Sequence, residues 1–118
     1  MDLKQLSDMQ LSMDERHGFP VKFDNARDTY AQLTKELVGL FGEIGEFANV
    51  VKKVNIKLDR PQDYSLDLDV ARDNLSEELS DSLIYIIRIA AMLGVDLESE
   101  VVKKMRLNES RYAQLRKK

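Results

Sequence analysis

The stretch EELSDSLIYIIRIAAMLG, from Glu77 to Gly94, decides the fold that we predict for this chain. From Leu83 onward it is apolar on nearly all sides, and a helix with that pattern is buried on all sides. Arg88 interrupts the apolar run, which is also too short to cross a bilayer. Glycine commonly follows the last residue of a helix. We therefore predict a deeply buried helix that begins between Ala71 and Ser76 and ends at Gly94.

Three further helices are predicted around this stretch. Apolar residues at helical spacing indicate one helix from about Leu3 to Arg16 and a long one from near Asn25–Asp28 to about Val54. A last helix is predicted from Asp96, its N-cap, to about Leu115, and the polar segment Lys57–Arg72 is predicted to be a loop. Strand-like alternation is lacking. The sequence therefore predicts an all-α, four-helix-bundle-like fold in a single domain that spans residues 1–118.

Composition narrows the class of protein and its partners. The chain has 118 residues, 43% of them hydrophobic and 33% charged, which is typical of a soluble globular domain. Its net charge of −3 offers no general attraction to nucleic acid or to an anionic membrane, so we expect neither as a partner. There is no cysteine, which excludes disulfides, thiolate metal sites and cysteine catalysis and is compatible with a cytoplasmic location. Nothing near Met1 resembles a signal peptide.

Two short acidic pairs lie within the two central helices. Glu43 and Glu46 are three residues apart, as are Glu78 and Asp81, so each pair shares one helix face beside the apolar seam. Facing acidic edges repel each other unless a cation lies between them, and hard cations such as Mg²⁺ prefer carboxylate oxygens. The pairs therefore predict a magnesium site across two helices. Without further motifs, a solvated helix face is the competing interpretation.

Two other features indicate close packing and self-association. Gly39, Gly42 and Gly45 recur at every third position, which lets another helix or a ligand approach the backbone, although ordinary helix packing explains them equally well. Three partner helices in a small domain can scarcely cover a helix that is apolar all round. We therefore predict a homo-oligomer whose interface includes the helix that ends at Gly94.

In three ordered segments the chain resembles the MazG-like all-α nucleotide pyrophosphohydrolases, a superfamily that includes dCTP pyrophosphatases, dimeric dUTPases and phosphoribosyl-ATP pyrophosphohydrolase. The first segment is Gly42–Glu46 followed by Lys52-Lys53, and the second is Glu77–Asp81 leading into Ser82–Ile87. The third is Gly94–Leu97 followed by Lys104, Asn108 and Arg111-Tyr112. The resemblance covers about Ala31 to Tyr112. The N-terminal region, where relatives recognise the base, is not closely matched, and the connection between Glu46 and Glu78 is long for the family.

The resemblance implies Mg²⁺-dependent hydrolysis of a nucleoside triphosphate, most simply a dNTP, to the monophosphate and pyrophosphate, in house-cleaning or pool control. Mn²⁺ is expected to substitute for Mg²⁺, and the subunits are expected to form a dimer or a tetramer. The alternatives are a phosphoribosyl-ATP pyrophosphohydrolase and a helical module that binds nucleotide without cleaving it. The resemblance implies that four carboxylates bind the metal and take part in catalysis: Glu43, Glu46, Glu78 and Asp81. It implies that five further residues bind the phosphates: Lys53, Lys104, Asn108, Arg111 and Tyr112.

The residues assigned to the substrate also have simpler interpretations. Lys104, Asn108, Arg111 and Tyr112 share one helix face, which could be an ordinary amphipathic surface. Lys53 lies near a helix end, where lysine complements the helix dipole. The segment His17–Phe19 could stack on a nucleobase, but a lone loop histidine is more often a polar surface residue.

Overall fold

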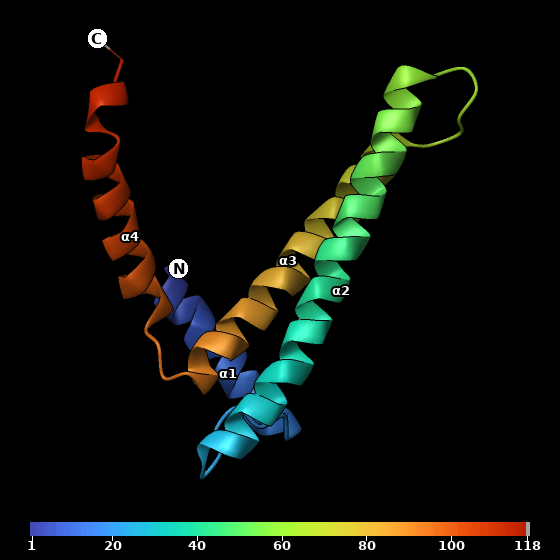
Figure 1. Ribbon diagram of the computed structural model, residues 1–118. Helices are drawn as coiled ribbons and strands as arrows, with labels where there is room; N and C mark the ends of the chain where they lie inside the picture. Colours follow the sequence, from blue (N-terminus) through green and yellow to red (C-terminus); the bar gives the residue numbers. More distant parts are fainter. Residues whose placement is uncertain (118) are drawn as a thin grey trace.

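The computed structural model describes residues 1–117 and consists of helices joined by short connections (Figure 1). The helices are α1 (Leu3–His17), α2 (Ala26–Asp59), α3 (Leu68–Met92) and α4 (Leu97–Arg111), followed by the short 3₁₀ helix η1 (Ala113–Leu115). No strand occurs within residues 1–117. The all-α prediction is confirmed.

Each α-helix begins with a side chain that caps its free backbone amides. Asp2 and Gln5 cap each other's backbone at the start of α1 in a capping box. Asn25, Asp67 and Asp96 accept hydrogen bonds from backbone N–H groups in the first turns of α2, α3 and α4. Asp96 has the role predicted from the sequence.

The connection between α2 and α3 is shorter than predicted. α2 continues beyond Val54 to Asp59, and α3 begins at Leu68, so the segment predicted as a loop is largely helical at both ends. Lys57 explains the tight return of the chain, because its Nζ donates hydrogen bonds to the carbonyl oxygens of Pro61 and Tyr64, at 2.8 and 2.9 Å. Sequence periodicity does not reveal such side chain–backbone contacts.

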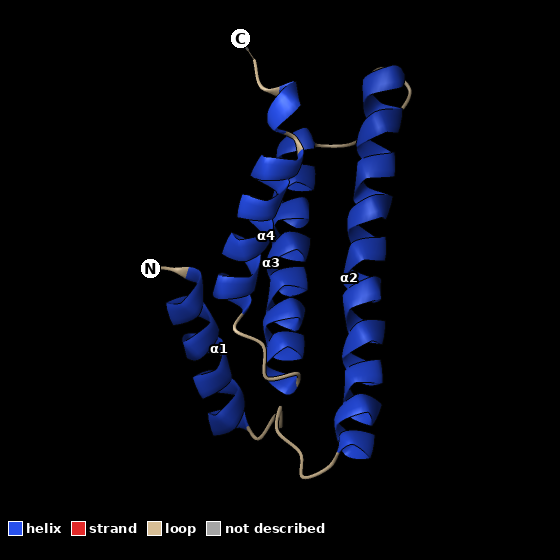
Figure 2. Ribbon diagram, turned by 60° about the vertical axis from the view of Figure 1, so that its left-hand side comes forward, coloured by secondary structure: helices blue, strands red, loops and turns tan. Residues whose placement is uncertain are grey.

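α2 and α3 form a long antiparallel hairpin, the main packing unit of the chain (Figures 1 and 2). α1 packs against α3 near one end of this hairpin, and α4 contacts α1. From there α4 diverges from the hairpin, so the molecule has an open V shape (Figure 1). The radius of gyration is 18.6 Å, whereas a compact domain of this length has about 13–14 Å.

The open shape leaves a small apolar core. Ala71, Ile87, Ala90 and Met92 are the buried hydrophobic residues among those described. Within a single chain the apolar part of α3 is only partly covered, because Leu83, Ile84 and Ile86 are 37%, 36% and 39% exposed. That a second copy covers this helix stays a prediction. The long apolar stripe of α2 is likewise only partly covered, with Phe41 65% exposed.

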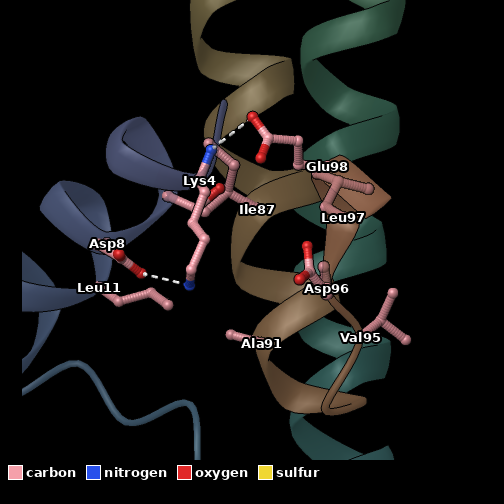
Figure 3. A pocket seen from close by; sticks show the side chains of 11 residues that line it. Lys4, Asp8, Leu11, Ile87, Ala91, Val95, Asp96, Leu97 and Glu98 are labelled. Atoms are coloured by element: carbon pink, nitrogen blue, oxygen red, sulfur yellow. Dashed lines mark hydrogen bonds and ion pairs between the residues drawn. The ribbon is translucent and has the colours of Figure 1, made fainter. Parts of the chain in front are cut away.

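A small cleft marks the junction of α1, α3 and α4 (Figure 3). It has a volume of about 190 Å³. The backbone N–H of Lys4 donates to Glu98 Oε1 at 3.4 Å, and Lys4 Nζ lies 3.8 Å from Asp8 Oδ1. The first contact ties the first turn of α4 to α1, and the second lies within α1. None of the predicted site residues lines the cleft.

In the part of the chain that the structure describes, no helix combines the length and the apolar character that crossing a membrane requires.

Candidate functional site

Three of the four predicted carboxylates meet between α2 and α3. Glu43 and Glu46 lie on α2, and Glu78 faces them from α3. One ligand oxygen of each lies within 4.8 Å of the others. Helical spacing explains the grouping, because residues three apart on α2 point to the same side and α3 runs antiparallel beside them. The arrangement is a cluster of acidic groups at the helix contact.

Glu78 is the member of the cluster most affected by its surroundings. Its Oε2 is buried and has no hydrogen-bond partner among the described residues. When Glu78 is protonated, it can instead donate to the Glu43 carboxylate. That interaction, followed by desolvation and by a similar interaction with Glu46, raises the pKa of Glu78 to about 8. The cluster therefore holds a proton at neutral pH in the place where a cation would satisfy the same oxygens.

The donor set fits a hard divalent cation. All three groups are carboxylates, the ligands that Mg²⁺ and Mn²⁺ accept, and one buried oxygen lacks a donor. Asp81 lies one turn beyond Glu78 on α3, outside the group of three but lining the same cavity as Glu43. Its predicted role as a fourth ligand stays a prediction.

A cavity of about 420 Å³ opens beside the acidic cluster. Its wall has acidic residues, a buried arginine and aromatic rings. The volume lies within the range of small-molecule sites. The lining residues come from α1, α2, α3 and the connection after α1: Gln10, Asp14, Phe19, Glu36, Glu43, Asp81, Ile84, Tyr85 and Arg88.

Tyr85 crosses the helix contact at Gly39. A Cβ at Gly39 would meet the phenol ring directly, with the Tyr85 Oη at 2.5 Å, so only glycine leaves room for this ring. The predicted close approach at the glycine row is therefore found at Gly39. At Gly42 and Gly45, by contrast, a Cβ would meet nothing within 4 Å.

A buried ionic network forms the inner wall of the cavity. Arg88 of α3 donates to Glu36 of α2 through Nε and Nη2, at 3.1 and 2.7 Å, in a two-pronged contact. Its Nη1 lies 2.7 Å from Asp14 Oδ2 of α1. The hydrogen bonds to Glu36 raise the pKa of Arg88 against the effect of burial. For Glu36, burial raises the pKa, but the hydrogen bonds from Arg88 and Gln32 outweigh it, and the net shift is downward.

Phe19 and His17, the predicted base contacts, have different positions. Phe19 follows α1 and lines the cavity, with its side chain largely exposed. His17 is the last residue of α1 and does not line the cavity. Its ring packs edge-on against Phe19, with centroids 6.2 Å apart. Of these two residues, only Phe19 is therefore placed to contact a ligand in this cavity.

The structure does not bring the five predicted phosphate contacts together within one chain. Lys53 is exposed on α2, beyond the acidic cluster. Lys104, Asn108 and Arg111 lie on α4, which diverges from the α2–α3 hairpin (Figure 1). Tyr112 follows α4, and the guanidinium of Arg111 lies 5.6 Å from its ring centroid.

Several residues of the cavity were missed by the sequence analysis, above all Asp14 and Glu36. For Glu36 a signal was present, because it lies seven residues before Glu43, two turns along the same helix face. Arg88 was noticed as a charge within an apolar run, but its partners were not identified. Both partners come from its own chain.

Comparison with known proteins identifies a family for the chain. The model of the MazG nucleotide pyrophosphohydrolase domain matches residues 30–114, which is most of the chain. The chain is also similar to dCTP pyrophosphatase 1 of Homo sapiens, at 41% identity over 76 residues, and to dCTP pyrophosphatase 1 of Rattus norvegicus, at 40%. Each alignment covers 64% of this chain and 43% of the relative, so the chain spans less than half the length of these curated relatives. By its match to the domain model, the chain belongs to the MazG nucleotide pyrophosphohydrolase domain family.

Proposed function

We propose that this chain is a Mg²⁺-dependent pyrophosphohydrolase that converts a deoxynucleoside triphosphate to the monophosphate and pyrophosphate. The observation that carries the proposal is the cluster of Glu43, Glu46 and Glu78, in which a buried carboxylate oxygen lacks a donor. Family membership and the similarity to dCTP pyrophosphatase 1 support the reaction class and make dCTP the first substrate to test.

The proposed roles follow from the positions of the side chains. Glu43, Glu46, Glu78 and Asp81 would hold the metal, which supplies charge neutralisation at the phosphates and a more acidic water when bound. A carboxylate of the α2 pair would accept the proton of the attacking water. Phe19 would stack on the base at the mouth of the cavity, with Tyr85 beside it. The activity would limit or clean a nucleotide pool, in the cytoplasm.

The first test is pyrophosphate release from a panel of dNTPs and NTPs, with Mg²⁺, with Mn²⁺ and with EDTA. We expect metal-dependent release from one or a few nucleotides. The variants Glu43→Gln, Glu46→Gln, Glu78→Gln and Asp81→Asn should each lose at least tenfold in kcat. Glu77→Gln is the matched control, because Glu77 is adjacent to Glu78 but exposed, about 100° away round the helix.

Other outcomes would change the assignment. Release from phosphoribosyl-ATP alone would make the chain a pathway enzyme rather than a dNTP pyrophosphohydrolase. Nucleotide binding without release from any substrate would indicate a non-catalytic module. Wild-type turnover in all four carboxylate variants would refute the site itself.

We further propose that the active form is a homo-oligomer. The chain exposes 9182 Å², whereas a compact chain of 13.6 kDa exposes about 6,600 Å². The excess is of the size that obligate interfaces cover. It includes apolar residues on the hairpin and on α4, such as Phe41, Leu79 and Met105. A second copy would cover them and produce a dimer, or a tetramer by repetition.

The same assembly would explain the position of α4. Because α4 diverges from the carboxylates of its own chain, Lys104, Asn108, Arg111 and Tyr112 would reach the phosphates of a site on a second copy (Figure 1). Light scattering should show an even number of subunits. Mixing inactive Glu78→Gln chains with inactive Arg111→Ala chains should restore activity, since some mixed sites carry neither change. A monomer, or mixtures without activity, would refute shared sites.

A further inference from the structure

We propose that Glu36 and Arg88, held by Asp14, are positioning residues that fix the register of the α2–α3 hairpin so that the metal carboxylates face each other. Their ionic contact lies at one end of a ladder of paired positions, and the carboxylates lie at the other. The consequence for metal binding rests on the proposed function, whereas the register itself does not.

The ladder follows from equal steps along two antiparallel helices. From Glu36, steps of three, four and three residues along α2 lead to Gly39, Glu43 and Glu46. From Arg88, the same steps backward along α3 lead to Tyr85, Asp81 and Glu78. Equal steps along antiparallel helices keep facing positions opposite each other.

Contacts support three of the four facing pairs of the ladder. Glu36 binds Arg88 through two hydrogen bonds, Tyr85 packs on Gly39, and Glu78 lies in the acidic cluster with both Glu46 and Glu43. The remaining pair is Glu43 and Asp81, which line the same cavity. One ionic pair and one close ring contact thus precede the two acidic pairs.

The geometry of the ionic network is suited to fixing one register. Arg88 presents a planar fork that matches a carboxylate, and Glu36 accepts both prongs. The side chains of Arg88, Glu36 and Asp14 are 11%, 7% and 5% exposed, so water does not replace these bonds. Gln10 donates to Asp14 Oδ1 at 3.0 Å, and Gln32 donates at 3.2 Å to Glu36 Oε1, which also accepts from Arg88. All three helices are joined at one guanidinium.

Apolar packing alone would hold this register weakly. Few apolar side chains are buried, and much of the hairpin surface is open. A slip by one helical turn moves α3 by about 5.4 Å relative to α2. The three carboxylate oxygens lie within 4.8 Å of one another, so such a slip would separate them. It would also leave two buried carboxylates without their cation, which is strongly unfavourable.

Stability and register can be separated by experiment. Replacing a whole buried ionic network by apolar residues of similar size often leaves stability unchanged or higher, because no charge is left unpaired. The variant D14L/E36M/R88M should therefore fold, while it lacks the directional bonds that select one register. R60M/D63L is the matched control, because it removes an exposed ion pair near the other end of the hairpin.

Register is measured between spin labels on cysteines introduced at Thr34 of α2 and Asp73 of α3, both of which are exposed. The chain has no cysteine of its own, and dilution with unlabelled chains removes distances between copies. Mn²⁺ affinity of the nucleotide-free protein is measured by titration calorimetry. In D14L/E36M/R88M we expect a distance distribution that is broadened or shifted by about one turn, and Mn²⁺ affinity at least tenfold weaker. R60M/D63L should match the wild type in both.

A folded D14L/E36M/R88M protein with the wild-type distance distribution would overturn the proposal. If that variant does not fold, Arg88→Lys decides, because lysine keeps the charge but not the fork. A broader distance distribution in Arg88→Lys supports the proposal, and an unchanged distribution with unchanged Mn²⁺ affinity overturns it. A wild type that binds no Mn²⁺ would refute the proposed metal site, while the distances would still decide the register.

Discussion

Tyr85 packs its phenol ring against the bare Cα of Gly39, at a point where a side chain of α3 meets the backbone of α2 directly. This contact lies between the Glu36–Arg88 bonds and the carboxylate cluster. Replacing Gly39 by alanine would force the ring, and with it the wall of the cavity, to move.

Gly39→Ala should therefore destabilise the protein although alanine is the better helix former. Overpacking typically costs about 1–3 kcal/mol, which exceeds the ~1 kcal/mol gained in helix propensity. Gly42→Ala is the control, because a Cβ at Gly42 meets nothing within 4 Å and the propensity gain should appear alone. Urea unfolding of both variants at one protein concentration measures the difference. A Gly39→Ala protein as stable as Gly42→Ala would show that Tyr85 moves aside freely.

The raised pKa of Glu78 predicts an unusual pH dependence in the metal-free protein. The folded state holds a proton on Glu78 up to about pH 8, whereas the ordinary value is 4.5. Its contribution to stability is therefore fully present below about pH 4.5 and is lost as the pH rises through about 8. In EDTA, the urea midpoint should fall between pH 5.5 and 8.5 in the wild type and stay flatter in Glu78→Gln. Equal slopes in the two proteins would contradict the assignment.

Metal binding should displace the proton that Glu78 holds. At pH 7, binding of Mn²⁺ requires Glu78 to ionise, so calorimetry in buffers of different ionisation enthalpy should detect close to one proton released per ion. As the pH rises through about 8, the release should fall toward zero. Glu77→Gln should release the same number of protons as the wild type. Binding without proton release at pH 7 would place the metal elsewhere.

The sequence allowed the number and type of the helices to be predicted, because their apolar periodicity and their caps are local signals. Asp96 and the end of the first helix, predicted at about Arg16 and observed at His17, were found in this way. The turn after α2 was not found, because it depends on hydrogen bonds from Lys57 to the carbonyl oxygens four and seven residues further along the chain. Whether a stripe is buried was also beyond the sequence, since Phe41 and Leu79 are apolar residues that a single chain leaves exposed.

Part of the candidate site could be predicted for a similar reason. Glu43, Glu46 and Glu78 were found because paired acids at helical spacing are visible along one segment. The partners of Arg88 were not, because Asp14 and Glu36 are 74 and 52 positions away and only the fold joins them. Long-range ion pairs leave no periodic trace in one sequence.

Phe19 should contribute to substrate binding more than to the chemical step. Its ring lines the cavity but belongs to the connection after α1, whereas the metal carboxylates belong to α2 and α3. Stacking of a base on an aromatic ring is worth about 1–3 kcal/mol, so Phe19→Ala should raise KM by roughly 5- to 160-fold with a smaller change in kcat. Phe19→Trp should retain binding, and His17→Ala should have little effect because His17 does not line the cavity. Steady-state kinetics on the preferred nucleotide measures all three. An unchanged KM in Phe19→Ala would remove the ring from the base site, and a large effect of His17→Ala would place the base on the other side of the ring.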